Sequence, residues 1–205
     1  VPEDILGSVL KTAVKPSFNA ITVDGDTSTN DACVLAASGL SGVVIDNLDS
    51  TGAKAFGEAV LSVCMELARA IVLDGEGATK LVEVQVEEAA DERQASQVAY
   101  TVAHSPLVKT ALFASDPNWG RILAAVGRAG VDRLQIDEVR IWLDDLLIVS
   151  QGGRDAGYTE AAGQAVMDKD SFVVRIALGR GEASSSVLTC DLSYDYVRIN
   201  AEYRS

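Results

Sequence analysis

The chain has few of the residues from which metal sites and disulfide frameworks are built. It holds one histidine, His104, and three cysteines, Cys33, Cys64 and Cys190, at long and unrelated spacings. With no CxxC pair and no second histidine, it offers no zinc ligand set. The cysteines lie in apolar helix-like or strand-like runs, so we expect three buried free thiols in a reducing cytoplasm. His104 lies at a predicted helix end, where the dipole favours it, rather than beside a nucleophile.

Basic residues and long apolar runs are also scarce. Seventeen Lys and Arg face 30 Asp and Glu, which leaves a net charge of −13. Such a surface repels phosphate backbones, so we expect no nucleic-acid partner. The acidity mainly keeps a protein in solution and remains compatible with a small amphoteric substrate. No stretch is long and apolar enough for a membrane span and no signal peptide opens the chain, so we expect no membrane association.

Aromatic residues make up only 5% of the chain, although hydrophobic residues make up 48%. The core must therefore consist mainly of Val, Leu, Ile and Ala, and 205 residues suffice for one large or two small cores. The charged run 87–92 is the most plausible border. We expect an N-terminal part over residues 1–88 and a C-terminal α+β domain over residues 89–205.

Hydrophobic periodicity predicts alternating helices and strands, which indicates an α/β fold. The expected helices cover residues 2–15, 51–73, 91–112, 122–129 and 159–167. The expected strands cover residues 18–23, 81–86, 139–149, 172–178, 186–192 and 194–201, and residues 32–37 form a further strand-like run. In the last strand, Tyr194, Tyr196, Arg198 and Asn200 would share one face.

Two polar loops interrupt this pattern. The loop 24–31 carries three aspartates that are suited to Mg²⁺ or Ca²⁺, but they lack the spacing of an EF-hand. We favour a structural loop in which these side chains cap backbone N–H groups. In the loop 74–80, Gly75 and Gly77 frame Glu76, so the backbone can approach a ligand closely. A carboxylate there suits an ammonium group or proton transfer, and a plain turn with a solvated glutamate fits equally well.

A third segment, Ser115 to Arg121, places a proline and a glycine between two helices. Asn118 or Asp116 is expected to cap the second helix, and Trp119 to lie in the core. Arg121 either binds a carboxylate or pairs with a neighbouring acid, and pairing is the commoner case. From these residues alone, a reaction does not follow.

Five sequence blocks occur along the chain in one order. They are SFN…ITVDGDTSTND (17–31), DGEGATK (74–80), SPLVK (105–109), SDPNWGR (115–121) and CDLSYDYVRINAEY (190–203). Each block alone is weak, but five in order are specific and cover the chain from end to end. Together they resemble the glutamate N-acetyltransferase/ornithine acetyltransferase family.

The resemblance implies a self-cleaving precursor with mixed sheets layered with helices, whose internal threonine becomes the first residue of a β chain. In the implied ping-pong reaction, this threonine carries the acetyl group of N-acetylornithine to glutamate in arginine biosynthesis. Its α-amino group can serve as base, and an oxyanion hole must stabilise the intermediate. No cofactor is implied, although some members accept acetyl-CoA as donor.

In these terms the chain would be a β chain that lacks the threonine segment. We expect the nucleophile upstream of Val1, no catalytic residue in this chain, and no activity without the α chain. The family assembly is a heterotetramer of two α and two β chains. Alternative functions are a related self-processing aminopeptidase or amidohydrolase, an acetyltransferase of secondary metabolism, and a non-catalytic partner chain.

The family's substrate-binding positions match three residues here, Glu76, Asn200 and Ser205, and none of them implies a metal. The resemblance places Glu76 at the cationic amino end of the substrate, and Asn200 and Ser205 at its α-carbon end. The loop 24–31 keeps its structural interpretation, close to the active site.

Overall fold

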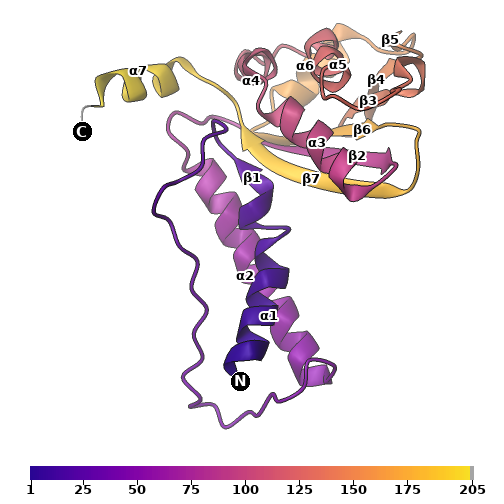
Figure 1. Cartoon of the computed structure of the whole chain (residues 1–205). Coiled ribbons are helices and arrows are strands. Elements are labelled where there is room, and N and C mark those ends of the chain that lie inside the picture. Colours follow the sequence, from indigo (N-terminus) through magenta and orange to yellow (C-terminus); the bar gives the residue numbers. More distant parts are fainter. Residues whose placement is uncertain (204–205) are drawn as a thin grey trace. The chain divides into compact units, whose positions relative to one another are not determined.

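The computed structural model describes residues 1–203, which contain both helices and strands (Figure 1). The helices are α1 (Glu3–Val14), α2 (Thr51–Leu73), α3 (Glu92–Ala103), α4 (Pro106–Phe113), α5 (Trp119–Gly127), α6 (Glu160–Met167) and α7 (Tyr194–Glu202), with short 3-10 helices at Phe18–Ala20 and Ile136–Glu138. The strands are β1 (Ile21–Thr22), β2 (Leu81–Ala89), β3 (Arg140–Leu143), β4 (Leu146–Ser150), β5 (Gly153–Arg154), β6 (Ser171–Ala177) and β7 (Ala183–Cys190). The α/β class is confirmed.

The chain divides into two compact units. The first comprises residues 1–21 and 26–70, and the second comprises residues 22–25 and 71 onward. The border expected at residues 88–89 lies inside β2, and therefore within the second unit. That residues 1–88 complete a domain shared with another chain remains a prediction.

The first unit is built on α1 and most of α2. Its small core contains Ile5 and Val9 of α1 with Ile45 and Ala53. Residues 26–50 contain neither helix nor strand, and most of their side chains are exposed. No helix among residues 1–203 is long and apolar enough to cross a bilayer.

Two strand predictions in the front part of the chain are wrong. Only Ile21 and Thr22 of the predicted strand 18–23 are extended, because residues 18–20 form a 3-10 turn. The run 32–37 pairs with no strand of the described chain, so Cys33 is exposed rather than buried. Cys64 and Cys190 are buried and free, as predicted.

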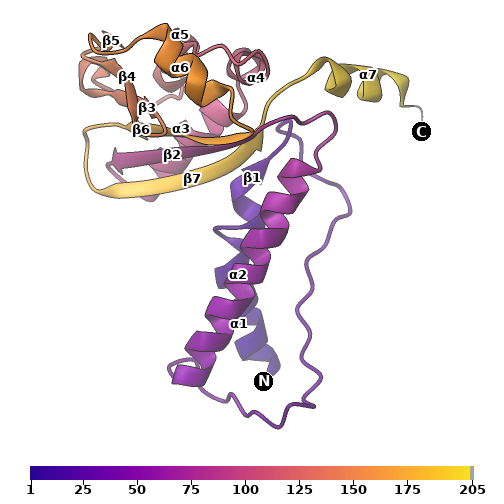
Figure 2. The ribbon, with the colours of Figure 1, turned by 180° about the vertical axis from the view of Figure 1, so that it is seen from behind.

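The second unit contains a mixed sheet with the strand order β1-β7-β2-β6-β3-β4-β5. The interior strand β2 pairs parallel with β6 and antiparallel with β7. Val82, Val84 and Val86 alternate into the core, as period-2 patterning requires. Figures 1 and 2 show helices α3 to α6 on one side of this sheet, where α3 contacts β2 and β7 and α6 contacts β3 and β4.

Each α-helix of the second unit after α2 begins at a side-chain cap. Asp91, Ser105, Asn118, Thr159 and Ser193 each accept a hydrogen bond from the backbone N–H three residues later. Such caps satisfy N–H groups that the first helical turn leaves unpaired. The cap at Ser105 divides the predicted helix 91–112 into α3 and α4.

The predicted strand at residues 194–201 is wrong, because these residues form helix α7. Alternation of Tyr, Val and Ile is typical of a strand, but the Ser193 cap and bonds to distant segments determine the outcome. Tyr196 and Asn200 are consequently one helical turn apart, about 6 Å along the axis instead of roughly 13 Å along a strand. The predicted strand 139–149 is a hairpin, turned at Asp144, which adopts φ +50°.

Candidate functional site

Glu76 lies in the loop 74–80, between α2 and β2, and its side chain is exposed. Gly77 adopts φ +68°, and a Cβ atom there would lie 2.5 Å from the backbone nitrogen of Tyr196. Ser193 donates a hydrogen bond to the carbonyl of Gly77 at 2.6 Å and accepts one from the amide of Tyr196 at 3.3 Å. Glycine is therefore required at position 77 for the loop to lie against the start of α7.

Asn200 of α7 lies beside Glu76. Its Nδ2 donates a hydrogen bond to Glu76 Oε2 at 2.8 Å and another to the carbonyl of Tyr196 at 3.0 Å. Both side chains are exposed, so this pair is accessible from solvent. The structure thus brings together two of the three expected site residues, although they are 124 positions apart in sequence. Ser205 lies outside the described residues.

The carboxylate of Asp191 holds the other end of the loop 74–80. Its Oδ1 accepts hydrogen bonds from the amides of Thr79 at 2.7 Å and Lys80 at 2.9 Å. Its Oδ2 accepts a third, from the Thr79 hydroxyl at 2.7 Å. Asp191 directly follows β7 and is only 3% exposed.

Lys109 of α4 is also buried, with 3% exposure, and contacts the end of β7. Its ammonium donates hydrogen bonds to the Thr189 hydroxyl at 3.0 Å and to the Cys190 carbonyl. Burial lowers the pKa of Lys109, an effect that the neighbouring Cys190 and Asp191 oppose. Burial likewise raises the pKa of the Cys190 thiol.

Sequence reasoning missed Lys109 and Asp191 as site residues. The available signal was a charged residue between predicted core residues: Lys109 lies next to the buried Val108, and Asp191 ends an apolar strand. Charged side chains are seldom fully buried without specific partners, so such positions merit attention.

Residues 22–25 adjoin the same region. Tyr196 donates a hydrogen bond to Asp24 Oδ2 at 3.0 Å, and His104 Nε2 lies 3.0 Å from the Thr22 hydroxyl. Desolvation and then the Lys109 charge lower the pKa of His104, whereas Asp24 raises it. His104 is the C-cap of α3, as predicted. No cluster of metal-ligating side chains occurs within the described part of the chain.

The segment 115–121 joins this network through Lys80. The Lys80 ammonium donates hydrogen bonds to Ser115 Oγ at 2.8 Å and to the carbonyl of Met167. Ser115 adopts φ +51° and itself donates to that carbonyl at 3.1 Å. Hydrogen bonds therefore connect residues from all five sequence blocks.

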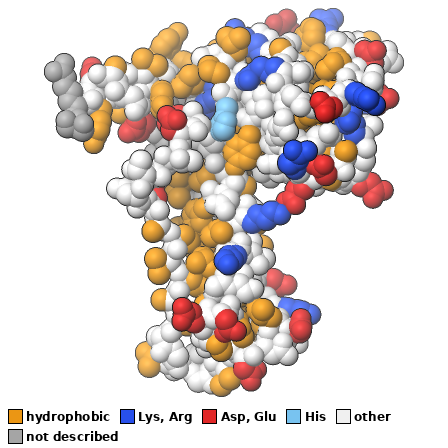
Figure 3. Space-filling view, in the orientation of Figure 1, with side chains coloured by type: hydrophobic (Ala, Val, Ile, Leu, Met, Phe, Trp, Pro, Cys, Tyr) orange, Lys and Arg blue, Asp and Glu red, His pale blue; other side chains and the backbone are white. Residues whose placement is uncertain are grey.

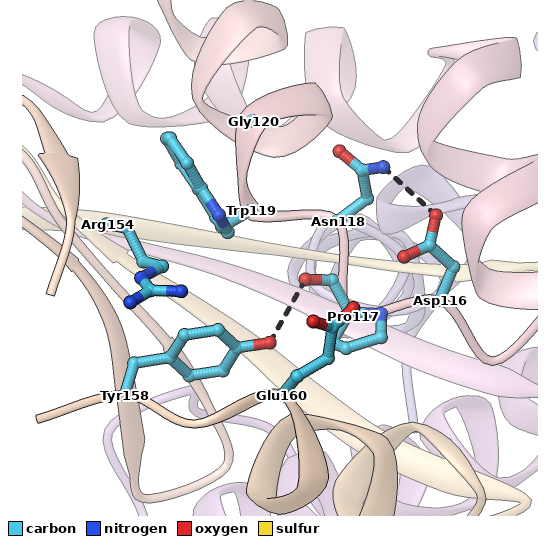
Figure 4. Close-up of a pocket in the computed structure, with 8 residues that line it drawn as sticks. All are labelled: Asp116, Pro117, Asn118, Trp119, Gly120, Arg154, Tyr158 and Glu160. Atoms are coloured by element: carbon cyan, nitrogen blue, oxygen red, sulfur yellow. Dashed lines mark hydrogen bonds between the residues drawn. The ribbon is translucent and has the colours of Figure 1, made fainter.

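The same segment lines a hollow of about 220 Å³ (Figure 4). Its walls are Asp116, Pro117, Asn118, Trp119, Gly120, Arg154, Tyr158 and Glu160. The Tyr158 hydroxyl donates to the Pro117 carbonyl at 3.4 Å. Neither Glu76 nor Asn200 lines this hollow.

The structure decides the predictions made for this segment. Asn118, rather than Asp116, caps α5. Trp119 is half-buried against the core. Within residues 1–203, Arg121 pairs with no acid and instead donates hydrogen bonds to the Leu107 carbonyl at 2.9 Å and the Thr110 hydroxyl at 3.3 Å.

Comparison with known families gives a match to the ArgJ family over residues 1–205. The chain belongs to the ArgJ family. It is 62% identical, over 201 residues and 98% of its length, to the arginine biosynthesis bifunctional protein ArgJ of Methylococcus capsulatus. It is 52% identical, over 206 residues and its whole length, to the protein of the same name from Pseudomonas fluorescens.

A solved member of the ArgJ family has the same fold. The crystal structure of the arginine biosynthesis bifunctional protein ArgJ from Bacillus halodurans superposes with a TM-score of 0.92 at 38% identity. The match covers 99% of this chain and 95% of that one. The chain spans about half the length of the curated relatives it matches, 49% of the first and 51% of the second.

Proposed function

We propose that the complete protein transfers the acetyl group of N-acetylornithine to glutamate in arginine biosynthesis. The hydrogen bond between Glu76 and Asn200 carries this proposal, because it joins the two described residues that match the family's substrate positions. Membership of the ArgJ family and relatives named as arginine biosynthesis proteins support it.

In the proposed site, Glu76 contacts the cationic amino end of the substrate, and Asn200 its polar α-carbon end together with Ser205. An exposed carboxylate 2.8 Å from an exposed amide suits a zwitterionic ligand. Glu76 accepts from the ammonium, and the Asn200 Nδ2, which here donates to Glu76 and Tyr196, donates to the carboxylate once the substrate replaces Glu76 as its acceptor. Neither residue is a nucleophile.

The proposed nucleophile is a threonine outside this chain. Its oxygen attacks the acetyl carbon of N-acetylornithine, the carbon–nitrogen bond breaks, and the departing amine of ornithine takes up a proton. The amine of glutamate then attacks the acetyl-threonine ester, and the threonine oxygen leaves with a proton. The acetyl group is conserved, so the reaction needs no cofactor, and acetyl-CoA would be an alternative donor.

The proposed partner is an α chain from the same precursor, in a cytoplasmic assembly of two α and two β chains. Exposed apolar side chains of the first unit support a partner, since soluble monomers rarely leave large apolar areas uncovered. Figure 3 shows hydrophobic side chains gathered along this unit. The strongly exposed ones include Val34, Leu40, Val43, Val44, Val63 and Leu67.

The Glu76→Gln substitution in the complete protein tests the assignment. It keeps the side-chain shape but removes the charge that pairs with ammonium, so we expect kcat/KM for N-acetylornithine to fall. For Asn200→Ala we expect a loss of about 1–3 kcal/mol in transition-state stabilisation, because a substrate polar group loses its partner. Steady-state kinetics measure both.

Glu182→Gln is the matched control, since Glu182 is exposed, directly precedes β7 and forms no hydrogen bond or ion pair with Glu76 or Asn200. Wild-type kinetics in Glu76→Gln would refute the role of Glu76. Release of ornithine without added glutamate would instead favour an aminopeptidase-type hydrolase. Transfer to an acceptor other than glutamate would favour secondary metabolism.

A further inference from the structure

Asp191 links the two segments that carry Glu76 and Asn200. Towards the loop 74–80, its carboxylate accepts three hydrogen bonds from Thr79 and Lys80, all between 2.7 and 2.9 Å. Along its own chain, two residues further, Ser193 caps α7. The buried side chain of Asp191 thus fixes the C-terminal end of the loop 74–80 to the segment that directly precedes α7.

A second contact holds the loop 74–80 against the start of α7. The hydroxyl of Ser193 donates to the carbonyl of Gly77 at 2.6 Å, so the loop is held on both sides of Ala78. Lys109 donates hydrogen bonds to Thr189 and Cys190 and so fixes the end of β7 itself. Asp191 consequently projects from a rigid base rather than from a mobile loop.

We propose that Asp191 is a positioning residue for the acetyl transfer, holding Glu76 at the distance and orientation from Asn200 that the substrate requires. The inference rests on the proposed function. Asp191 does not touch the substrate. It acts through Thr79 and the backbone of Lys80, three and four residues after Glu76.

The alternative is a purely structural role, in which loss of Asp191 lowers the amount of folded protein and nothing else. The two roles differ in kinetics. A displaced Glu76 weakens alignment in every folded molecule, so activity per folded molecule falls, whereas a structural role leaves it unchanged. Misplacement by about 1 Å is enough to lower a rate roughly 100-fold.

The test is a double-mutant cycle in the complete protein. We expect Asp191→Ala to lower kcat/KM for N-acetylornithine about 10- to 100-fold, since two amides and a hydroxyl lose their acceptor. Because Asp191 acts through Glu76, the double variant with Glu76→Gln should be no worse than the more impaired single variant, within about twofold. If the effects of Asp191→Ala and Glu76→Gln on kcat/KM multiply in the double variant, the inference is overturned.

Asp144→Ala is the matched control. Asp144 is also an aspartate that accepts a backbone hydrogen bond, from Val173 at 2.9 Å, and it pairs with Lys169 at 2.6 Å. It contacts neither the loop 74–80 nor α7. We expect its kcat/KM per folded molecule to equal that of the wild type, and Glu76→Gln to have the same effect in either background.

Two milder variants keep the test decisive if Asp191→Ala does not fold. Thr79→Val removes only the hydroxyl donor to Asp191 and should lower kcat/KM to an intermediate degree, without additivity with Glu76→Gln. Asp191→Asn keeps an oxygen for both amides and should stay within about threefold of the wild type. A wild-type kcat/KM in Thr79→Val would contradict the inference, whereas a wild-type kcat/KM in Glu76→Gln would contradict the proposed function.

Discussion

Two buried charged residues, Lys109 and Asp191, lie next to Cys190, and they differ in their hydrogen-bond partners. Lys109 donates to a hydroxyl and a carbonyl, whereas Asp191 accepts from two amides and a hydroxyl. Glu76 and Asn200 could be predicted through the family motifs. For Lys109 and Asp191 the sequence shows only charged residues in apolar surroundings, because their hydrogen-bond partners lie 80 and 112 positions away, outside any local pattern.

The pKa of Lys109 gives a prediction on stability. Burial lowers it below that of an ordinary lysine, so the unfolded chain binds this proton more tightly than the folded one. As pH rises from the folded pKa to the ordinary value of about 10.4, the contribution of Lys109 to stability therefore increases. Lys109→Met abolishes this titration, so the stability deficit of the variant should widen between neutral and alkaline pH.

Urea unfolding at both pH values measures this difference. At neutral pH we expect a deficit of about 1–3 kcal/mol, because the Cys190 carbonyl and the Thr189 hydroxyl lose their donor. Lys169→Met is the control: Lys169 is half-exposed and pairs with Asp144 at the surface, so its loss should matter by less than about 1 kcal/mol. If the stability deficit of Lys109→Met narrows at alkaline pH, the lowered pKa of Lys109 is contradicted.

For helices and strands, the predictions were correct where the hydrophobic periodicity extends over many residues. The predicted helix 51–73 has the observed bounds of α2, and the alternating strand at 81–86 lies within β2, a mostly buried interior strand of the sheet. The strand prediction for residues 194–201 was wrong because these residue types prefer strands. The cap at Ser193 and hydrogen bonds to Glu76 and Asp24 hold them in a helix instead. A local sequence pattern carries no information on contacts between residues this far apart.

The contact between the loop 74–80 and α7 predicts the effect of a methyl group at Gly77. Gly77→Ala should destabilise the protein by at least about 1–2 kcal/mol, since φ +68° is unfavourable for alanine. The added Cβ would also lie 2.7 Å from Ser193 Oγ, which should displace α7 and reduce activity. Thermal unfolding and kinetics of the complete protein measure the two effects.

Gly7→Ala is the opposite case and serves as control. Gly7 lies inside α1, and a Cβ there meets no atom within 4 Å. Alanine favours a helix over glycine by about 1 kcal/mol, so this variant should be slightly more stable and equally active. Equal destabilisation by both substitutions would show that the close approach at Gly77 is not what matters.

At the scale of the whole molecule, residues 26–50 stand apart, because they are mostly exposed and contain no regular element. We expect thermolysin, which cuts before large apolar residues, to cleave the isolated chain first near Val34, Leu40 or Val43. Mass spectrometry of early fragments identifies the sites. First cleavage within β2 or α3 would contradict the prediction.

Trypsin provides the comparison, since no lysine or arginine occurs between Lys15 and Lys54. It should leave the segment intact under conditions in which thermolysin cuts it. In the complete protein, the proposed α chain should slow the thermolysin cut if it covers the exposed apolar side chains. Equal rates with and without the partner would show that this surface is not covered.

The same lack of amines affects how the assembly can be mapped. Reagents that couple lysines cannot report on residues 16–53, so cross-linking by amine chemistry would omit the segment with the most exposed apolar side chains. The segment does carry five aspartates, namely Asp24, Asp26, Asp31, Asp46 and Asp49. Carboxylate-directed hydrazide reagents should therefore form the cross-links that identify its neighbours in the intact assembly.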